Sequence, residues 1–557
     1  MSKVYEILAE VFRREDTPVC FSLLGDANMN WAGALAARGT RMIYTRHEHA
    51  AVAAATAHAR RTGRTGVATV TCGPGLSQIV TALPAAVRAS IPLVIFAGES
   101  PIGAAWYNQE LDQGPVVTST GAAYVPLHSI SRMPEAIRNA FVQAHEERRP
   151  VVLGVPLDLQ SREWPGGDLP TPSADIIARP SPMPPNPDDV TAAARRIASA
   201  KRIVVMGGLG AASSGASDAC RALASKLGAL LTTTLPARGL FQGDPFCVGI
   251  SGGFSSTLAR ALFAEADLVI SFGAQLTSHN LDKGKLYPNA EFLRVDTRPQ
   301  SVTQGLVLPG THLRGDARLT AEALVEAVEE AGGWRSDRLA AAIGSAVCDT
   351  ATFPQDSYLD PRDVTSALDA ALPQDWQMVN SSGHCSFYTA HMHRPFETFL
   401  TIREYGAIGN GLPYAMGAAA SDPERPVVLF DGDGSIMMNV QELETIRREG
   451  LKVLICCYND RAYGSEIHKL RDEGLPDDGA VFGETDLAAI ARGFGLGGHR
   501  VDDLSELPDL IETFRASGGA MLLDFHVSDR IASPVVRRAH PGGHCGTEHP
   551  VSLEGLL

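Results

Sequence analysis

The sequence predicts an α/β protein of three domains, each built on a mostly parallel β-sheet flanked by helices. Two observations lead to this fold class. Short apolar runs alternate with Ala-rich helical stretches along the chain, and unbroken apolar strands between helices are typical of parallel sheets covered on both faces. The chain also has 557 residues, which at about 150 residues per domain corresponds to three or four domains.

Several segments are predicted to be buried strands because they are short and apolar and lie between helical stretches. They are residues 66–71, 92–97, 151–155, 202–206, 268–272, 427–430 and 453–457. The first residues, MSKVYEILAEVFRRE, predict an amphipathic helix with interspersed charges rather than a signal peptide. A further helix is expected to start at Asp360-Pro361-Arg362.

Two breaks in composition divide the chain. The first, from Ser161 to Asp189, is rich in Pro and has neither a helical nor a strand period, so it predicts an extended linker. The second extends from Gly332 to Ser357. We therefore expect domains at residues 1–165, 188–331 and 358–557, the last of them with a C-terminal tail.

Charge and cysteine content narrow the class of partner and the compartment. Lys plus Arg is 48 and Asp plus Glu is 63, giving a net charge of −15, which argues against nucleic acid and anionic membrane surfaces as partners. No apolar run reaches the roughly 20 residues that a membrane span needs. The 9 Cys include the adjacent pair Cys456 and Cys457, which cannot readily bridge each other. Reduced thiols in the cytoplasm are therefore expected.

The most specific motif lies in the third segment. A strand-like run leads into Asp431-Gly432-Asp433-Gly434-Ser435, a helix follows, and the next strand ends at Asn459-Asp460. A right-handed βαβ unit would bring the carboxyl ends of both strands to one edge of the sheet. Asp433 and the Asn459-Asp460 pair should then converge there.

Oxygen ligands at such an edge suit Mg²⁺, which is commonly shared with phosphate groups. Gly432 and Gly434 permit a tight turn and a close approach of the backbone. The amides of Gly434 and Ser435, at the helix start, would face an anion. A plain turn in which Asp serves as a helix N-cap is the structural alternative.

This motif resembles the thiamine-diphosphate signature of the acetohydroxyacid synthase and pyruvate decarboxylase group. The resemblance implies Asp433, Asp460 and the carbonyl of Ala462 as Mg²⁺ ligands. The family usually ends the motif in Asn-Asn, whereas this chain has Asn459-Asp460. Which of these two side chains faces the metal is left open by the sequence, and Asn459 is expected in the cofactor site in either case.

The first segment carries a second part of the signature. Thr45-Arg46-His47-Glu48-His49-Ala50-Ala51 precedes a helix and the sequence GVATVTCGPG, and the spacing is similar to that of the family. Glu48 falls on the glutamate that activates the cofactor by hydrogen bonding to its aminopyrimidine ring. A carboxylate that merely stabilises a helix N-terminus is the structural alternative.

A third part of the resemblance is Gly406-Ala407-Ile408-Gly409-Asn410-Gly411-Leu412-Pro413. It implies that the Gly406 carbonyl holds the aminopyrimidine and that Ile408 supports the folded shape of the cofactor. A buried core Ile is the alternative for Ile408. Gly383-His384 is similar to a loop on the diphosphate side of the site.

Three further residues are expected near the reacting atoms. Asp26, in Gly25-Asp26-Ala27-Asn28, matches a catalytic acid of the decarboxylases, and Glu466 is in register with a second active-site Glu. Paired carboxylates in unlike environments can relay protons. Gln109 falls in a loop that is similar to one in the synthases and would supply an active-site amide. An exposed loop Asp and a helix-start Glu are the structural alternatives.

The resemblance covers essentially the whole chain and names the domains as pyrimidine-binding, central Rossmann-like and diphosphate-binding. It implies a homodimer or homotetramer with active sites between subunits. We expect a lyase or transferase that uses thiamine diphosphate and Mg²⁺ to decarboxylate or cleave a 2-oxo acid or diketone and to transfer the acyl carbanion to an acceptor, as a carboligase does. FAD is judged unlikely, because Gln275 stands where the synthases have an Arg.

Four alternatives remain at this point. The chain could be a simple 2-oxo acid decarboxylase that releases an aldehyde, or a C–C hydrolase or lyase of a diketone. It could also be a nucleotide-binding oxidoreductase built on the turn Gly207-Gly208-Leu209-Gly210, or a non-catalytic relative. The role of the His-containing C-terminal tail is open.

Overall fold

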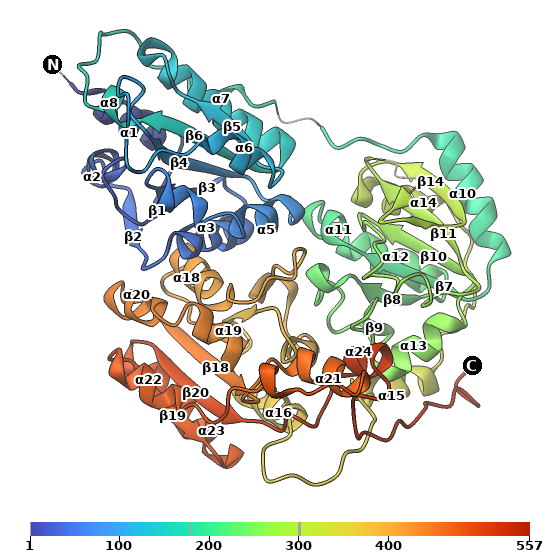
Figure 1. Cartoon of the computed structure of the whole chain (residues 1–557). Coiled ribbons are helices and arrows are strands. Elements are labelled where there is room, and N and C mark those ends of the chain that lie inside the picture. Colours follow the sequence, from blue (N-terminus) through green and yellow to red (C-terminus); the bar gives the residue numbers. More distant parts are fainter. Residues whose placement is uncertain (1, 179–180, 299–301) are drawn as a thin grey trace.

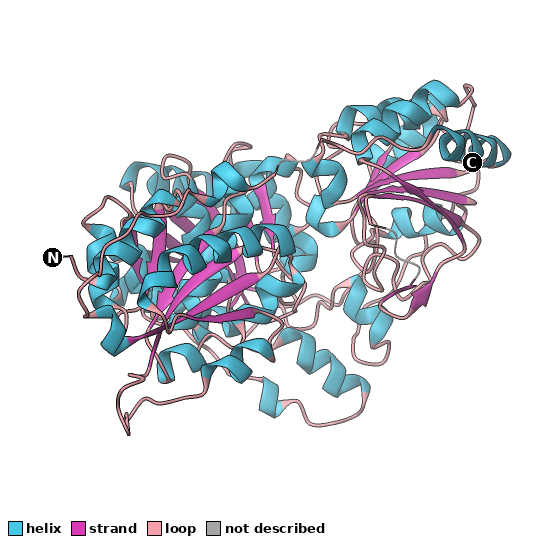
Figure 2. Ribbon diagram, turned by 90° about the horizontal axis from the view of Figure 1, so that it is seen from above, coloured by secondary structure: helices cyan, strands magenta, loops and turns pink. Residues whose placement is uncertain are grey.

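The computed structural model contains three six-stranded sheets, and all strands within each of these sheets are parallel. The structure describes residues 2–178, 181–298 and 302–557. Helices lie on both faces of the sheets (Figures 1 and 2). The predicted fold class is thus confirmed. Residues 179–180 of the expected linker and 299–301 of the expected central domain lie outside the described residues.

The first sheet has the strand order β2-β1-β3-β4-β6-β5. Its strands are β1 (Val19–Ser22), β2 (Arg41–Tyr44), β3 (Gly66–Val70), β4 (Leu93–Glu99), β5 (Ala123–Pro126) and β6 (Pro150–Pro156). The helices around it are α1 (Val4–Arg14), α2 (Met29–Ala36), α3 (Glu48–Thr62), α4 (Pro74–Ser77), α5 (Ala82–Arg88), α6 (Gln113–Thr118), α7 (Met133–Glu147) and α8 (Leu157–Gln160).

The central sheet has the order β14-β11-β10-β7-β8-β9, which is the order of dinucleotide-binding folds. Its strands are β7 (Ile203–Gly207), β8 (Leu230–Thr233), β9 (Cys247–Ile250), β10 (Leu268–Phe272), β11 (Glu291–Asp296) and β14 (Gly310–Arg314), and a separate hairpin is formed by β12 (Val302–Thr303) and β13 (Leu306–Val307). The helices are α10 (Pro187–Ser199), α11 (Leu209–Ser213), α12 (Ser217–Lys226), α13 (Thr257–Ala264), α14 (Ala317–Ala327) and α15 (Asp337–Gly344).

The third sheet has the order β16-β15-β17-β18-β20-β19. Its strands are β15 (Gln377–Asn380), β16 (Phe399–Thr401), β17 (Val427–Gly432), β18 (Val453–Asn459), β19 (Gly497–Val501) and β20 (Met521–His526). The helices are α16 (Pro361–Ala371), α17 (Ser386–Thr389), α18 (Gly411–Ser421), α19 (Asp433–Met438), α20 (Glu442–Arg448), α21 (Gly464–Asp472), α22 (Leu487–Gly493), α23 (Leu507–Ser517) and α24 (Pro534–Ala539).

The first and third sheets share one topology, since their strands follow the same spatial order from edge to edge. In this correspondence β3 is the counterpart of β17, and α3 is the counterpart of α18. The loops that follow β3 and β17 therefore occupy equivalent places at the carboxyl edges of their sheets, where ligands bind in open α/β folds.

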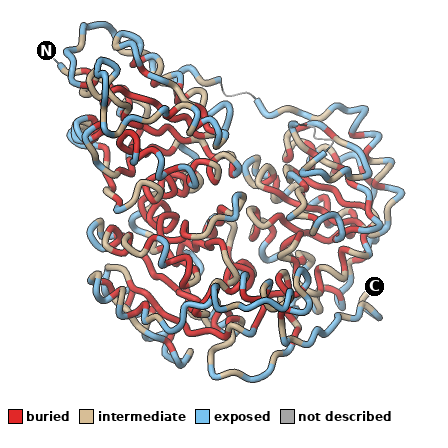
Figure 3. The backbone as a smooth tube through the Cα atoms, in the orientation of Figure 1, coloured by how far each residue is buried: buried red, intermediate tan, exposed pale blue. Residues whose placement is uncertain are grey.

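Helices α3 and α18 pack against each other between these two domains (Figure 1). Both are rich in Ala, and residues 50–59 of α3 and 411–420 of α18 are buried, as the red tube in Figure 3 shows. At Gly417 a methyl group would lie only 2.1 Å from the carbonyl oxygen of Ala54, so the absence of a side chain permits this approach. His49 Nε2 and Asn410 Oδ1, 2.6 Å apart, join the two helix starts.

All of the predicted strands are present, as β3, β4, β6, β7, β10, β17 and β18. Helix α16 also starts as expected, with the Asp360 side chain accepting from the Arg362 amide and Pro361 in the first turn. The linker expected at residues 161–189 is not extended throughout, because it contains α9 (Ser173–Ile176) and the first residues of α10. The Ser173 amide donates to the Glu15 carboxylate at 3.0 Å, which fastens this short helix to the end of α1.

No helix among residues 2–178, 181–298 and 302–557 is both long enough and apolar enough to cross a membrane.

The carboxyl group of Glu442 makes the stability of the contact between the first and third domains dependent on pH. It is fully buried and accepts hydrogen bonds from the Arg46 amide, at 3.0 Å, and from Thr445 Oγ1. Burial raises the pKa of Glu442 to about 7. A raised pKa means that the folded protein holds the proton more tightly than the unfolded chain does. Protonated Glu442 therefore makes its full contribution to the free energy of unfolding below the pKa that this group has in the unfolded chain. That contribution is lost as the pH rises through about 7.

We expect Glu442→Gln to make the free energy of unfolding less dependent on pH. The part that the variant removes is at most about 3 kcal/mol. The measurement is the midpoint of thermal unfolding at several pH values between about 5 and 8. The wild-type midpoint should fall more steeply than that of the variant. Glu444→Gln is the control, since Glu444 is partly exposed and pairs with Arg448 at 3.0 Å. Equal slopes for wild type and Glu442→Gln would contradict the assignment.

Candidate active site

The ends of β17 and β18 place two aspartates side by side. The strands are parallel neighbours with Gly432 opposite Tyr458. Asp433 follows the last residue of β17 and opens α19, while Asp460 follows the last residue of β18. The convergence expected from the βαβ unit is therefore present.

These two carboxyl groups are buried and interact with each other. Burial, followed by the charge of Asp460, raises the pKa of Asp433, and burial raises that of Asp460. Asp433 Oδ1 is buried and has no hydrogen-bond partner in the structure. Two adjacent buried carboxylates cannot both ionise without a compensating cation. Their hard oxygen atoms, with an open acceptor on Asp433, fit a divalent cation such as Mg²⁺.

The side chain of Asn459 points away from this pair. Its amide nitrogen donates to Asp524 Oδ1 at 3.0 Å and to the Thr485 carbonyl at 3.1 Å. Asn459 thus ties β18 to β20 and to the chain that precedes α22. The structure brings Asp460, and not Asn459, next to Asp433.

A single cavity is lined by most of the residues expected in the third domain. From the predicted set it includes His384, Ile408, Gly432, Asp433, Gly434, Ser435, Asp460, Ala462 and Glu466. Cys385 and Tyr463 also line it, as do Ser528 and Ile531 from the segment after β20. Sequence reasoning missed these four, and the last two have no motif that could have pointed to them.

His384 stands in the wall of this cavity as a neutral imidazole. Burial lowers its pKa to about 4. Its Nδ1 lies 3.9 Å from Asp460 Oδ2. Glu466 lies on the first turn of α21, where Lys469 donates to it at 2.7 Å, and its side chain is half exposed.

The loop before α18 is tied to the turn after β17. The Gly409 amide donates to Ser435 Oγ at 2.8 Å, and Ser435 Oγ donates to Asp431 Oδ2 at 3.0 Å. Gly406 and Gly409 have φ values of 72° and 87°, in the region that favours glycine. This frame holds Ile408 in the cavity wall, whereas Gly406 does not line the cavity.

The expected residues of the first domain gather around the loop after β3, residues 71–75. Glu48, half-buried, is the first residue of α3, and its Oε1 would lie 3.5 Å from a methyl group placed on Gly75. Cys72 Sγ donates to Gln109 Oε1 at 3.4 Å. A methyl group on Gly73, which has a φ of 56°, would lie 2.1 Å from the Gln109 carbonyl oxygen, so the two loops touch through backbone.

Asp26 lies on the same side, exposed at the turn before α2. Burial raises the pKa of the Cys72 thiol, and the charge of Asp26 makes a smaller contribution in the same direction. None of Glu48, Asp26 and Gln109 lines the cavity that contains Asp433. The described chain therefore holds two separate groups of candidate site residues, one at the end of β3 and the other at the ends of β17 and β18.

Exposed apolar side chains follow or precede members of both groups in the sequence. In the first domain, Leu24 and Met29 flank Asp26, and Ile102 and Trp106 precede Gln109; Trp106 has 76% of its surface exposed. In the third domain, Tyr405 precedes Gly406, and Met437 and Met438 follow Ser435. Exposed apolar clusters of this kind are typical of surfaces that another chain or a ligand covers.

In the central domain the glycine-rich turn packs against the loop after β10, at the strand boundary where dinucleotide-binding folds place their ligand. At the boundary between β7 and β10 the amide of Gly210 donates to the Gly273 carbonyl at 3.0 Å. A methyl group on Gly208 would lie 2.2 Å from that same carbonyl oxygen. The glycine-rich turn thus serves close packing of one loop on another, and the Gly210 amide is already engaged within the chain.

Comparison with known families matches all three domains. Residues 2–116 match the N-terminal TPP-binding domain of thiamine pyrophosphate enzymes, residues 190–324 match the central domain, and residues 381–525 match the C-terminal TPP-binding domain.

Curated relatives extend over nearly the whole length. A protein named probable 2-ketoarginine decarboxylase AruI, from Pseudomonas aeruginosa, is 30% identical over 526 residues, with 90% of each chain covered. The acetolactate synthase isozyme 2 large subunit of Escherichia coli is 28% identical over 541 residues, with 94% of each chain covered. An acetolactate synthase large subunit from Parasynechococcus marenigrum is 29% identical, covering 87% of this chain and 80% of its own length.

Proposed function

We propose a reaction for this chain from its family, since it belongs to the thiamine pyrophosphate enzymes of the acetolactate synthase and decarboxylase group. It would use thiamine diphosphate and Mg²⁺ to decarboxylate or cleave a 2-oxo acid or diketone. The resulting acyl group would then be transferred to an acceptor. The observation that carries the proposal is the buried pair Asp433 and Asp460, which faces into the cavity beside His384 and Ile408.

Residues of the third domain would hold the anionic end of the cofactor. Asp433, Asp460 and the carbonyl of Ala462 would bind Mg²⁺, whose charge offsets that of the diphosphate. Gly432, Gly434, Ser435 and His384 line the same wall, with Asn459 bracing β18 behind it. When bound, thiamine diphosphate supplies the nucleophilic carbon that breaks or forms a bond next to a carbonyl. Gly406 and Ile408 would orient its pyrimidine end.

Residues of the first domain would complete the site. Glu48 would hold a proton at the pyrimidine ring through its carboxyl oxygen. Because Glu48, Asp26 and Gln109 lie outside the cavity of their own chain, we propose that a second copy supplies them, in a homodimer or homotetramer. The exposed apolar residues close in sequence to both groups support this arrangement.

The choice between transfer and simple decarboxylation depends on how a proton reaches the product. Asp26 is exposed and Glu466 is half exposed, and either carboxyl group would be able to deliver a proton to the product. This favours the release of an aldehyde. The relative named as a decarboxylase supports this second candidate. Gln109, held by Cys72, supports the synthase-like candidate. Hydrolytic cleavage of a diketone is a third candidate within the same chemistry.

Three further parts of the proposal concern the rest of the chain. We propose that FAD is not a cofactor, supported by the internally bonded turn at Gly208 and Gly210. We propose domain limits at 1–165, 188–331 and 358–557, supported by the extents of the three sheets. We propose a cytoplasmic location, supported by free thiols such as those of Cys456 and Cys457.

Replacing Glu48 by Gln is the most direct test of the cofactor chemistry. The variant keeps the size of the side chain but cannot hold or donate the carboxyl proton, so we expect turnover to fall by about 100-fold or more while the thermal unfolding midpoint stays unchanged. Glu146→Gln, at an exposed position on α7, is the control and should retain full activity. Normal turnover by Glu48→Gln would rule out the proposed role.

Product analysis with pyruvate separates the candidate reactions. The enzyme is incubated with thiamine diphosphate and Mg²⁺, with and without an acceptor aldehyde, and the products are identified by mass spectrometry. A hydroxyketone or acetohydroxyacid is the expected product of acyl transfer. Acetaldehyde alone, even with the acceptor present, would favour the simple decarboxylase. If the enzyme converts neither pyruvate nor longer 2-oxo acids, the result favours a diketone as the substrate.

A further inference from the structure

The chain that follows β20 forms part of the cavity wall and continues into the C-terminal tail. Ser528 and Ile531 line the cavity, and Ser533 is the residue that immediately precedes α24. This segment, residues 527–543, is called the tail strap below. It is packed against the third domain through several hydrogen bonds.

Ser533 makes a hydrogen bond to His384, a side chain that lines the cavity. Its backbone amide donates to His384 Nε2 at 2.9 Å. A backbone N–H can only donate, so Nε2 must be the unprotonated nitrogen of the ring. A neutral His384 then carries its proton on Nδ1. That nitrogen lies on the side of Asp460 and would be 3.0 Å from a methyl group on Gly464.

A second histidine binds the tail strap next to the first. The His468 ring lies 5.3 Å from the His384 ring at an angle of 69°. His468 Nδ1 is 2.9 Å from the Gly543 carbonyl, to which it donates. The strap therefore contacts this pair of imidazoles from both ends of α24, and His468 packs edge-on against His384 so that the ring of His384 is held in one orientation.

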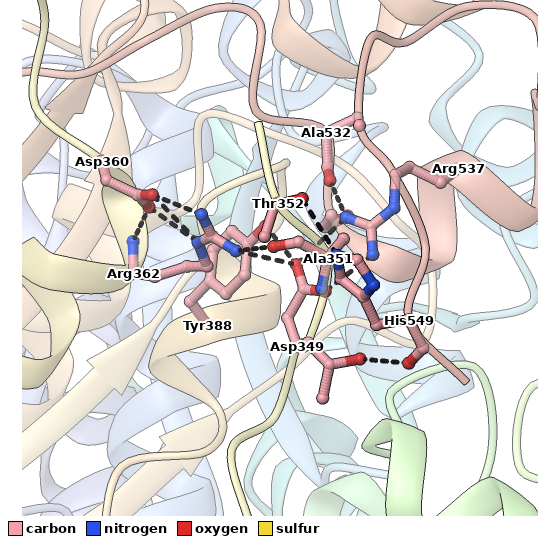
Figure 4. A network of polar contacts seen from close by, with 12 residues as sticks. Asp349, Ala351, Thr352, Asp360, Arg362, Tyr388, Ala532, Arg537 and His549 are labelled. Atoms are coloured by element: carbon pink, nitrogen blue, oxygen red, sulfur yellow. Dashed lines mark hydrogen bonds and ion pairs between the residues drawn. The ribbon is translucent and has the colours of Figure 1, made fainter. Parts of the chain in front are cut away.

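The strap itself is anchored by a buried ion pair. Arg537 binds Asp349 through two nitrogens, at 2.7 and 3.0 Å, and also donates to the Ala532 carbonyl (Figure 4). Both charged side chains are at most 1% exposed. Ala532 immediately precedes Ser533, so this ion pair fixes the backbone amide that His384 accepts from.

We propose that the Ser533 amide is a positioning group that sets the tautomer and orientation of His384, so that Nδ1–H points into the cavity and donates to the diphosphate group of the cofactor. The inference rests on the proposed function, because the diphosphate is the anion that would accept this hydrogen bond. A group that orients a metal-ligating imidazole through its other nitrogen commonly changes the affinity of the site by about 10-fold or more, and we expect the same constraint to act on an imidazole that donates to an anion. Ser533 acts through His384 and does not itself touch the cofactor.

Ser533→Pro tests this inference with a matched control. The φ of Ser533 is −65°, the value that proline imposes, so the variant removes the N–H and places the ring carbon against His384 with little change in the backbone. Ser533→Ala keeps the amide. With Mg²⁺ present, the dissociation constant of thiamine diphosphate is measured by calorimetry. We expect Ser533→Pro to weaken binding by about 10-fold or more and Ser533→Ala to leave it unchanged.

The double variant shows whether the effect passes through His384. In the His384→Ala background, Ser533→Pro should cause no further loss of affinity, since the ring that the amide positions is gone. An equal loss in both backgrounds, or no loss in the wild-type background, overturns the inference. Failure of the wild type to bind thiamine diphosphate would instead overturn the proposed function, and the inference with it.

A measurement on the wild-type protein covers the case in which Ser533→Pro does not fold. Nitrogen NMR of protein labelled in its histidine rings, with His384→Gln used to identify the signal, reports which ring nitrogen carries the proton. We expect the proton on Nδ1. A proton on Nε2 would overturn the inference whatever the variants show.

Discussion

The close packing of α3 on α18 is the constraint on which the arrangement of the molecule depends. It exists because Gly417 has no side chain where the carbonyl of Ala54 approaches. The contact holds the two sheets of like topology together and brings the start of α3, with Glu48, to a fixed place relative to the loop before α18, with Ile408. The hydrogen bond between His49 and Asn410 and the buried carboxylate of Glu442 secure the ends of the same interface.

A second constraint is electrostatic. Two aspartates buried side by side destabilise a protein unless a proton or a cation compensates their charge. The chain keeps Asp433 and Asp460 in this state and surrounds them with glycine turns, a neutral His384 and a strap anchored by Arg537. This arrangement reserves space for a cation and an anionic ligand, so the net charge of −15 does not prevent the binding of a diphosphate.

The local features of the fold and of the candidate site are predictable from the sequence alone. The strands β17 and β18, the turn at Asp433 and the helix start at Asp360 each follow from short patterns with a physical cause. The sequence could not decide between Asn459 and Asp460, because the deciding partner of Asn459 is Asp524, on another strand. The contact of Ser533 with His384 joins residues far apart in the chain and leaves no local pattern. The short helix α9 was missed because its partner, Glu15, is equally remote.

The central claim is that each active site combines the first domain of one chain with the third domain of another. Co-production of Glu48→Gln and Asp433→Ala chains tests it most directly. Each variant alone should be inactive, whereas a mixed dimer has one site with both residues intact, so the mixture should recover about a quarter of wild-type activity. Asp433→Ala with Asp460→Ala is the control and should stay inactive, since every site then lacks one metal ligand. A mixture of the first pair that remained as inactive as its components would contradict the account.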